Sequence, residues 1–327
     1  ESYIEERPDS ALVVLEQIVP SELSSKEEKA KYSLLYSMAL DKNFVDKTDF
    51  EVLQPAIDYY KDNGSATDKL RTYYYQGRIY QNAGNDAAAM EAFVKAISEG
   101  NESNDILTKA RTYFAQSHIY YSLYEWDNFI EANKNSALLF KESGMINSYA
   151  NCLNRIINGY TLKEEPDSAW PYIYECKTLL QDMSISRLTE FYASYLTYLT
   201  NFGTEQEMNE ILQEYISAVP SSMIDRLTIA NAYLKMNNYN EALSVLSEYD
   251  TSYDVAKERK YLSIISDIYQ GLEDHKRALE SYKKYIILAD SIDSAIYTQD
   301  TRFVEERHKL ELQTLKEKES KMRVILW

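Results

Sequence analysis

The stretch 70–103 constrains the fold of this chain most, because small and aromatic residues occupy fixed positions in two successive helical segments. Gly77 and Ala89 fall where two packed helices would cross closely, so only small side chains fit there. Tyr80 and Phe93 fill the space beside them, and Ala96 is the next small position. A unit of two helices cannot bury its apolar face alone. The sequence therefore predicts that the pattern repeats.

The pattern recurs twice at an offset of 40 residues and again nearer the C-terminus. The equivalent residues are Ser117, Tyr120, Phe129 and Ser136; Ile157, Tyr160, Ala169, Ile173 and Cys176; Ala230, Tyr233, Ala242, Leu246 and Tyr249; and Ser266, Tyr269, Ala278, Tyr282 and Tyr285. Residues 187–220 fit less well: their second helix carries Met208, Leu212 and Tyr215, but the first cannot be fixed. Recovery after this weak stretch favours one continuous solenoid.

The repeat pattern is more degenerate in the N-terminal part of the chain. Residues 9–18 read as a lone second helix that ends before Pro20, with Ala11, Leu15 and Ile18 towards the core. Residues 26–40 are amphipathic, and residues 50–61 place Ala56 and Tyr60 at core positions. We interpret these segments as an opening helix and an elongated repeat.

These positions resemble the tetratricopeptide repeat, a two-helix unit of roughly 34 residues. The resemblance implies an all-α fold, a right-handed α-α superhelix of about six repeats plus the opening helix, spanning residues 1–290. Eight Gly and six Pro in 327 residues are few for a strand-and-turn fold, which also favours helices. The 30 Tyr exceed what the aromatic repeat positions need, and a ligand groove could use the remainder.

Charge and motifs exclude several classes of function. The net charge of −17 argues against a nucleic-acid surface, which needs a basic stripe. His118, His275 and His308 show no metal-ligand spacing, and the chain has no glycine-rich phosphate loop and no GxSxG elbow. We therefore expect a binding protein rather than an enzyme, with no cofactor and no metal. Cys152 and Cys176 are too few for a disulfide framework, and we expect buried thiols, although a bridge stays possible.

The resemblance also implies where a ligand would bind. In tetratricopeptide repeats the first helix of each pair lines a concave groove. Carried over residue by residue, the candidate groove residues are Arg71, Tyr74, Arg78, Arg111, Phe114, His118, Tyr121, Asn154, Asn158 and Asn231. Arginine pairs with a carboxylate through two parallel hydrogen bonds, and asparagine amides can bond a peptide backbone. The alternative is that these arginines pair with acidic residues of neighbouring repeats. The usual Lys and Asn clamp pattern of peptide-binding members is not reproduced, so the ligand class does not carry over.

Residues 291–327 differ from the repeats. They lack the small positions, carry Glu and Lys at helical spacing and turn apolar at 324–327, which favours a charged helix and juxtamembrane linker. The whole chain is similar to the sensor regions of bacterial membrane-anchored tetratricopeptide regulators, of the helix-turn-helix or histidine-kinase type. That resemblance implies a segment of a longer protein that binds a peptide or protein on the periplasmic side of the inner membrane, with a span after Trp327 and possible dimerisation through the last helix. The alternative is a soluble, cytoplasmic scaffold or co-chaperone-like adaptor that docks a partner's C-terminal tail.

Overall fold

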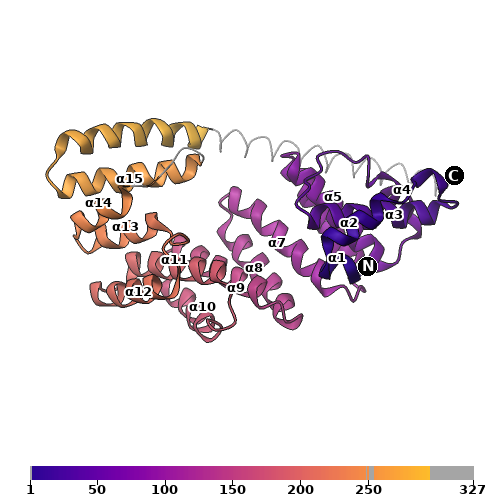
Figure 1. Ribbon diagram of the computed structural model, residues 1–327, viewed down its shortest axis with the longest axis horizontal. Helices are drawn as coiled ribbons and strands as arrows, with labels where there is room; N and C mark the ends of the chain where they lie inside the picture. The colour runs from indigo at the N-terminus through magenta and orange to yellow at the C-terminus, as the bar shows by residue number, and fades with distance from the viewer. Residues whose placement is uncertain (1, 248, 250–253, 295–327) are drawn as a thin grey trace, which may run out of the picture. The chain divides into compact units, whose positions relative to one another are not determined.

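The computed structural model describes residues 2–247, 249 and 254–294, and within these ranges the chain is helical with no strand (Figure 1). Successive helices form antiparallel pairs, as the repeat pattern predicts. The chain divides into two compact units that meet between Leu123 and Tyr124 in the sequence. Each unit is described by itself.

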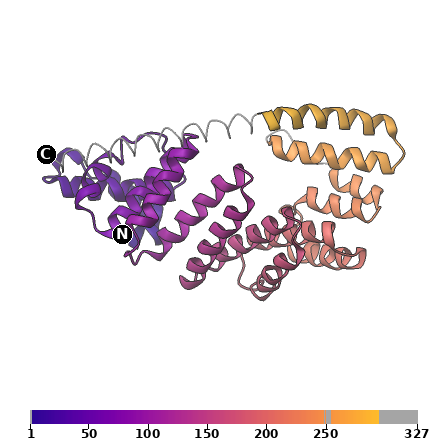
Figure 2. The same ribbon diagram turned by 180° about the vertical axis from the view of Figure 1, so that it is seen from behind.

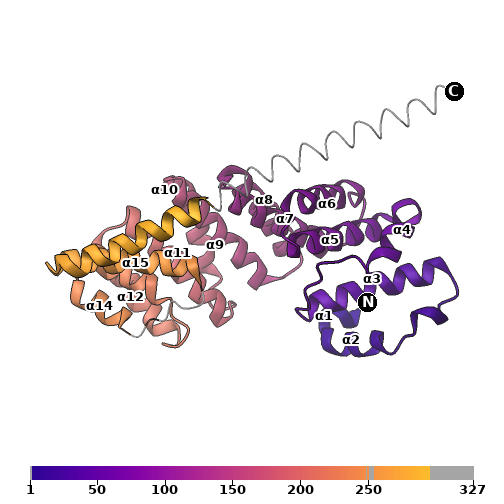
Figure 3. The same ribbon diagram turned by 90° about the horizontal axis from the view of Figure 1, so that it is seen from above.

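Unit 1 contains the N-terminal helices. Its elements are α1 (Ser2–Glu6), α2 (Pro8–Glu16), the 3-10 turn η1 (Pro20–Glu22), α3 (Lys26–Lys42), α4 (Gln54–Asn63), α5 (Ala66–Asn82), α6 (Asp86–Glu99) and α7 (Ile106–Ser122). The helix predicted for residues 9–18 is present as α2, but it is not a lone helix, because α1 precedes and contacts it; both lie beside α3 (Figure 3). Ala11 and Leu15 are buried as predicted. The prediction for Ile18 is wrong: α2 ends at Glu16, and Ile18 is 37% exposed.

The core of unit 1 explains the small residues of the repeat. Ala89, Phe93 and Ala96 are fully buried between α5 and α6. A Cβ atom built on Gly77 would lie 2.4 Å from Cε1 of Phe93, well inside the contact distance of two carbon atoms. Glycine at position 77 therefore lets the Phe93 ring pack directly against the backbone of α5.

Several first helices end in the same way, with a residue in the left-handed region. These residues are Phe44, Gly84, Tyr124, Glu164, Asn237 and Glu273, with φ between 56° and 73°. The first four are spaced by 40 residues, which is the offset of the repeat in the sequence. After α5, the N–H of Asn85 donates to the carbonyl of Tyr80 and that of Gly84 to the carbonyl of Gln81, the pattern of a Schellman motif.

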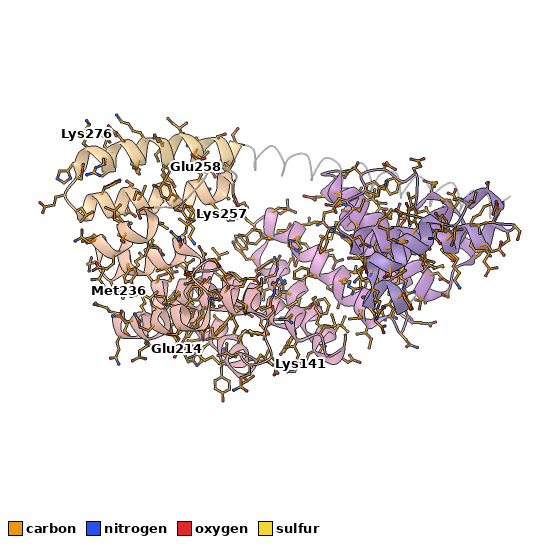
Figure 4. The ribbon with its side chains drawn as sticks, in the orientation of Figure 1. Lys141, Glu214, Met236, Lys257, Glu258 and Lys276 are labelled. Carbon is orange, nitrogen blue, oxygen red and sulfur yellow. The ribbon has the colours of Figure 1, made fainter. Side chains whose placement is uncertain are left out.

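Side-chain caps fix where many of the helices begin. Ser25 with Glu28, Ser65 with Asp68, and Thr204 with Glu207 form reciprocal capping boxes. Asp254 caps α15 by accepting the backbone N–H groups of Ala256 and Lys257. Figure 4 shows Lys257 and Glu258 in the first turn of this helix.

Unit 2 contains the remaining helices. They are α8 (Trp126–Glu142), α9 (Ile146–Leu162), α10 (Pro166–Thr178), α11 (Ile185–Phe202), α12 (Glu205–Ala218), α13 (Arg226–Lys235), α14 (Tyr239–Leu246), α15 (Val255–Gly271) and a further helix from residue 275 that continues through residue 294. This last helix runs antiparallel to α15 (Figures 1 and 2) and contacts it through the hydroxyl of Ser266, which donates to the carbonyl of Ala278. Tyr282, predicted to be core, is instead 52% exposed on it.

The charged helix predicted for residues 291–327 lies almost wholly outside the described residues. The same holds for the juxtamembrane linker and the dimerisation surface assigned to it. Among the helices described, none is both long and apolar enough to cross a membrane.

Candidate ligand-binding site

A cluster of charged side chains in unit 1 joins α1, α3 and α7. The guanidinium of Arg111 donates two parallel hydrogen bonds to Glu5, with Nη1 2.8 Å from Oε1 and Nη2 2.8 Å from Oε2. The Nζ of Lys42 donates to the same carboxylate, 2.9 Å from Oε2. Arg111 and Lys42 are largely buried, with 17% and 20% of their side chains exposed, and Glu5 is 37% exposed. We call Glu5, Lys42 and Arg111 the Glu5 triad.

The two cations hold Glu5 in its charged form. Partial burial raises the pKa of Glu5, but the hydrogen bonds and charges of Arg111 and Lys42 outweigh burial and lower this pKa from 4.5 to about 2. Burial and the nearby Arg111 charge lower the pKa of Lys42, in spite of its bond to Glu5. Two cations therefore share one carboxylate, and the triad has a net charge of +1, two positive groups minus one negative.

Arg78 lies on α5, between the two helices that supply the cations of the Glu5 triad. Its Nε is 3.3 Å from Oδ1 of Asp41, and its Nη1 donates to Oε1 of Gln81 at 2.7 Å. A cavity of about 20 Å³ beside Arg78 is lined in part by Asp41, Tyr75 and Asn82. This volume holds about one water molecule. Arg78 thus has a long, single bond to its acidic neighbour and little adjoining space.

Arg71 has a structural partner. Its Nε donates to Oδ2 of Asp105 at 2.6 Å, and the two side chains are only 19% and 12% exposed. Asp105 also caps α7, because its carboxylate accepts the N–H and the hydroxyl of Thr108. Burial raises the pKa of Asp105, but the bonds from Thr108 and Arg71 outweigh it and lower the pKa below its ordinary value. All three predicted groove arginines therefore have an acidic partner within unit 1, which is the alternative that the sequence left open.

The predicted aromatic residues of unit 1 divide into buried and exposed. Tyr74 is only 6% exposed and packs against Tyr75 and Phe93, with ring centroids 4.9 and 6.1 Å away. Phe114 is half-buried, and its ring meets the exposed His118 edge-on at 4.9 Å. Tyr121 is 50% exposed at the end of α7. Of the aromatic residues predicted for the groove, Tyr74 is thus part of the core, whereas Tyr121 is exposed to solvent.

A second concavity of unit 1 lies between α4, α5 and α6. It has a volume of about 180 Å³ and is lined by Ile57, Tyr60, Lys61, Lys69, Thr72, Tyr73, Gln76 and Lys95. Lys69 is 3.0 Å from Glu99, and Lys95 is 2.7 Å from Glu91. Two of its three lysines are therefore paired already.

The three asparagines predicted for the groove belong to unit 2. Asn154 is 3% exposed: its Oδ1 is 3.6 Å from the thiol of Cys176, and its Nδ2 is buried without a hydrogen-bond partner among the described residues. Asn158 and Asn231 are half-buried. Next to Asn154, Arg155 donates to Oδ1 of Asn133 at 3.1 Å. The structure establishes no common site that joins these residues with the arginines of unit 1.

The sequence analysis did not select two members of the Glu5 triad, Lys42 and Glu5. Lys42 precedes Asn82, in the first helix of the repeat at residues 70–103, by the 40-residue offset of the repeat, so extending the repeat alignment towards the N-terminus would have placed Lys42 on the corresponding helix. Glu5 gives no such signal, because it bonds to a residue 106 positions away and lies outside every recognisable repeat.

The structure describes the two cysteines as free thiols. Cys152 and Cys176 are both fully buried, as predicted, and no disulfide joins them. Burial raises the pKa of Cys152 to about 11. Over the described part of the chain, no group of three or more His, Cys, Asp or Glu side chains is arranged to hold a metal ion.

Comparison with known proteins supports the repeat pattern. The family model described as tetratricopeptide repeat matches residues 70–99. Among solved structures, the chain is similar to one titled "Crystal Structure of Rap Protein Complexed with Competence and Sporulation Factor", with a TM-score of 0.54 over 96% of both chains and 11% sequence identity. The fold is a tetratricopeptide-like solenoid. No curated protein sequence matches the chain. At this identity the Rap protein shows the solenoid fold alone and does not show which ligand this chain binds.

Proposed function

We propose that this chain is a non-catalytic, peptide-binding solenoid whose unit 1 receives an acidic side chain or a C-terminal carboxylate. The observation that carries the proposal is the Glu5 triad. In a chain whose net charge is −17, Arg111 with two hydrogen bonds and Lys42 with one already bind a carboxylate, and both cationic side chains are mostly buried. A buried pair of cations is costly unless an anion accompanies it, so the pair selects for a carboxylate. The Rap protein, of similar fold, was crystallised with the Competence and Sporulation Factor, and it supports a peptide as the kind of ligand.

The test is binding of a library of short peptides to the protein, monitored by thermal unfolding. A ligand that binds only the folded state increases the free energy of unfolding by mass action, by about 2.7 kcal/mol at a ligand concentration of a hundred times its Kd. The melting temperature rises as a result. We expect peptides with an acidic residue or a free C-terminal carboxylate to raise the melting temperature of the wild type. The shift should be lost in Arg111→Ala and reduced in Arg78→Ala.

The matched control is Arg277→Ala, which removes the same charge from an exposed pair with Asp274 in unit 2. It should keep the full shift, and circular dichroism should show equal helix content in all variants. The proposal fails if no peptide stabilises the protein, or if peptides stabilise Arg111→Ala as well as the wild type. Amidated versions of each active peptide separate the two carboxylate sources: a C-terminal tail loses binding on amidation, and an acidic side chain does not.

The finer role that we propose is that of a sensor region in a membrane-anchored signalling or transcription-regulatory protein. It is supported by the sequence resemblance, and it would place unit 1 on the periplasmic side of the inner membrane, without direct contact to nucleic acid. The second candidate is a soluble adaptor for a partner's C-terminal tail. Fractionation of cells that express the full-length gene distinguishes them, since the sensor cofractionates with the inner membrane and the adaptor does not.

A further inference from the structure

The concavity of unit 1 between α4, α5 and α6, here named the α4–α6 concavity, has a basic lining. Its eight lining residues include one lysine from each of the three helices and no acidic side chain. Lys69 is paired with Glu99 and Lys95 with Glu91, whereas Lys61 forms no ion pair within the described part of the chain. Three lysines and two glutamates give this group a net charge of +1. The lining therefore favours an anion with a single negative charge.

Thr72 adds a hydroxyl that no other group of the fold uses. It lines the α4–α6 concavity, is 3% exposed, and its Oγ1 is buried without a hydrogen-bond partner among the described residues. The same position 40 residues later holds Thr112, which is also buried and whose Oγ1 donates to the carbonyl of Thr108 at 2.7 Å. A buried hydroxyl normally has such a partner. Thr72 thus differs from its repeat equivalent in keeping a donor available for a ligand.

Apolar side chains supply another part of the lining, and the space is larger than a water site. Ile57, Tyr60 and Tyr73 line the concavity from α4 and α5. Its volume of about 180 Å³ is nine times the 20 Å³ of the cavity beside Arg78. Since one water needs about 10–15 Å³, this volume accepts a ligand of roughly ten non-hydrogen atoms. A monoanion with an apolar body matches these walls, as apolar walls with a few polar groups are typical of small-molecule sites.

The α4–α6 concavity lies on another face of α5 than the predicted groove. An α-helix turns by about 100° per residue. Arg71, Tyr74 and Arg78 therefore share one face of α5, and Thr72 and Gln76, which line the concavity, share the largely opposite face. No member of the Glu5 triad lines the concavity. The two places can consequently be tested independently.

We propose that the α4–α6 concavity binds a small organic carboxylate. Lys61 pairs with the carboxylate, the hydroxyl of Thr72 donates to one of its oxygens, and Ile57 and Tyr73 contact its apolar body. This site goes beyond the proposed peptide site and does not depend on it.

The probe is para-fluorobenzoate, whose dissociation constant is measured by fluorine NMR titration against the wild type, Thr72→Val and Lys61→Gln. We expect Thr72→Val to weaken binding about ten-fold, because it removes a hydrogen bond to a charged group and keeps the shape of the side chain. Lys61 is exposed, so Lys61→Gln should weaken binding only about three-fold. The neutral para-fluorobenzamide should bind much more weakly than the carboxylate.

Thr112→Val is the matched control for Thr72→Val, because it makes the same change at the equivalent position of the next repeat. Lys31→Gln is the control for Lys61→Gln, since it removes the same charge from an exposed position of α3. Both controls should bind the probe as the wild type does, and so should Arg111→Ala. Melting temperatures without probe give a second readout: Thr112→Val should lose stability, whereas Thr72→Val should not, because only Thr112 gives up a hydrogen bond.

Several outcomes would refute the carboxylate site. These are no binding of para-fluorobenzoate to the wild type, equal binding of the benzamide, or wild-type affinity in both Thr72→Val and Lys61→Gln. Binding that is lost in Arg111→Ala but kept in Thr72→Val would assign the probe to the Glu5 triad and refute it too. If inorganic phosphate binds as tightly as the probe, the apolar walls contribute nothing and the assigned ligand class is wrong. The peptide-library test is unaffected by any of these results, so the two proposals fail separately.

Discussion

At the residue scale, position 77 has no room for a side chain. A Cβ atom there would lie 2.4 Å from Cε1 and 2.6 Å from Cδ1 of Phe93. Gly77→Ala should therefore destabilise the protein by about 1–3 kcal/mol, the usual cost of overpacking a core. Urea unfolding followed by circular dichroism measures the change.

The control separates steric clash from backbone strain. Gly84 has φ +73°, and a methyl group added to it would meet no atom within 4 Å, so Gly84→Ala should cost about 1–2 kcal/mol through strain alone. Adding Phe93→Leu should recover part of the loss in Gly77→Ala but none in Gly84→Ala. Equal recovery in both would show that the ring of Phe93 is not the obstacle.

The Glu5 triad predicts a dependence of stability on pH. Because the pKa of Glu5 falls from 4.5 in the unfolded chain to about 2 in the folded one, its contribution is complete above pH 4.5 and disappears as the pH falls towards 2. The shift alone corresponds to about 3 kcal/mol, and solvent screening of this partly exposed side chain reduces the expected effect to about 1 kcal/mol.

The measurement is the free energy of unfolding of wild type and Glu5→Gln between pH 2 and pH 6. The two should differ most at pH 6 and converge near pH 2. A constant difference over this range would contradict the assignment. Glu6→Gln, which changes an exposed neighbour of Glu5 on the same helix, should follow the wild type throughout.

The sequence predicted residues that repeat and missed those that do not. Gly77, Ala89, Phe93 and Ala96 are recognisable because the same packing constraint recurs in each helix pair. Glu5 is not, because a long-range ion pair leaves no periodic trace in either segment. For the same reason the sequence selected Arg71, Arg78 and Arg111 as groove candidates without their acidic partners.

At the element scale, the left-handed residues that end the first helices are sites of strain. Phe44 is 93% exposed, so its side chain contributes little packing, yet its φ is 59°, which costs a β-carbon residue about 1–2 kcal/mol. Glycine at this position would remove the strain, but it would also raise the conformational entropy of the unfolded chain, which offsets part of the gain in stability. Phe44→Gly should therefore stabilise the protein by roughly 0.5 kcal/mol.

Val94→Gly is the matched control, because Val94 is also exposed but lies inside α6. The same new residue should there destabilise by about 0.5 kcal/mol, since glycine is a poor helix former. Thermal unfolding of the two variants gives the comparison. Loss of stability in both would mean that Phe44 makes contacts that outweigh its strain.

Helix boundaries and types were predictable where the repeat positions are occupied in the usual way. The first helix of residues 187–220 was not, because α11 fills its buried face with large aromatic residues, Phe191, Tyr192 and Tyr195, in place of small ones. Ile18 and Tyr282 were assigned to the core by pattern but are exposed. A repeat pattern gives the face of a helix, and whether that face is covered depends on the neighbouring element.

At the scale of the whole molecule, the net charge of −17 opposes the folded state through self-repulsion. Raising the salt concentration from about 10 mM to 150 mM shortens the Debye length from about 30 Å to 8 Å and screens most of this repulsion. We expect the melting temperature at pH 7.5 to rise by a few degrees. Near the isoelectric point of 4.7 the same addition of salt should have little effect, and a fall in melting temperature at pH 7.5 would contradict the prediction.

Because its two thiols are buried, the opening of unit 2 can be followed by thiol labelling. Cys152 and Cys176 lie on α9 and α10, are fully enclosed, and ionise far less readily than free cysteine. Cys152 contacts Ser136 of α8 and Cys176 contacts Asn154 of α9, so a thiol-specific reagent cannot modify them until this part of unit 2 opens locally. The rate of labelling in native buffer consequently measures how often this part of the solenoid opens, without any engineered probe.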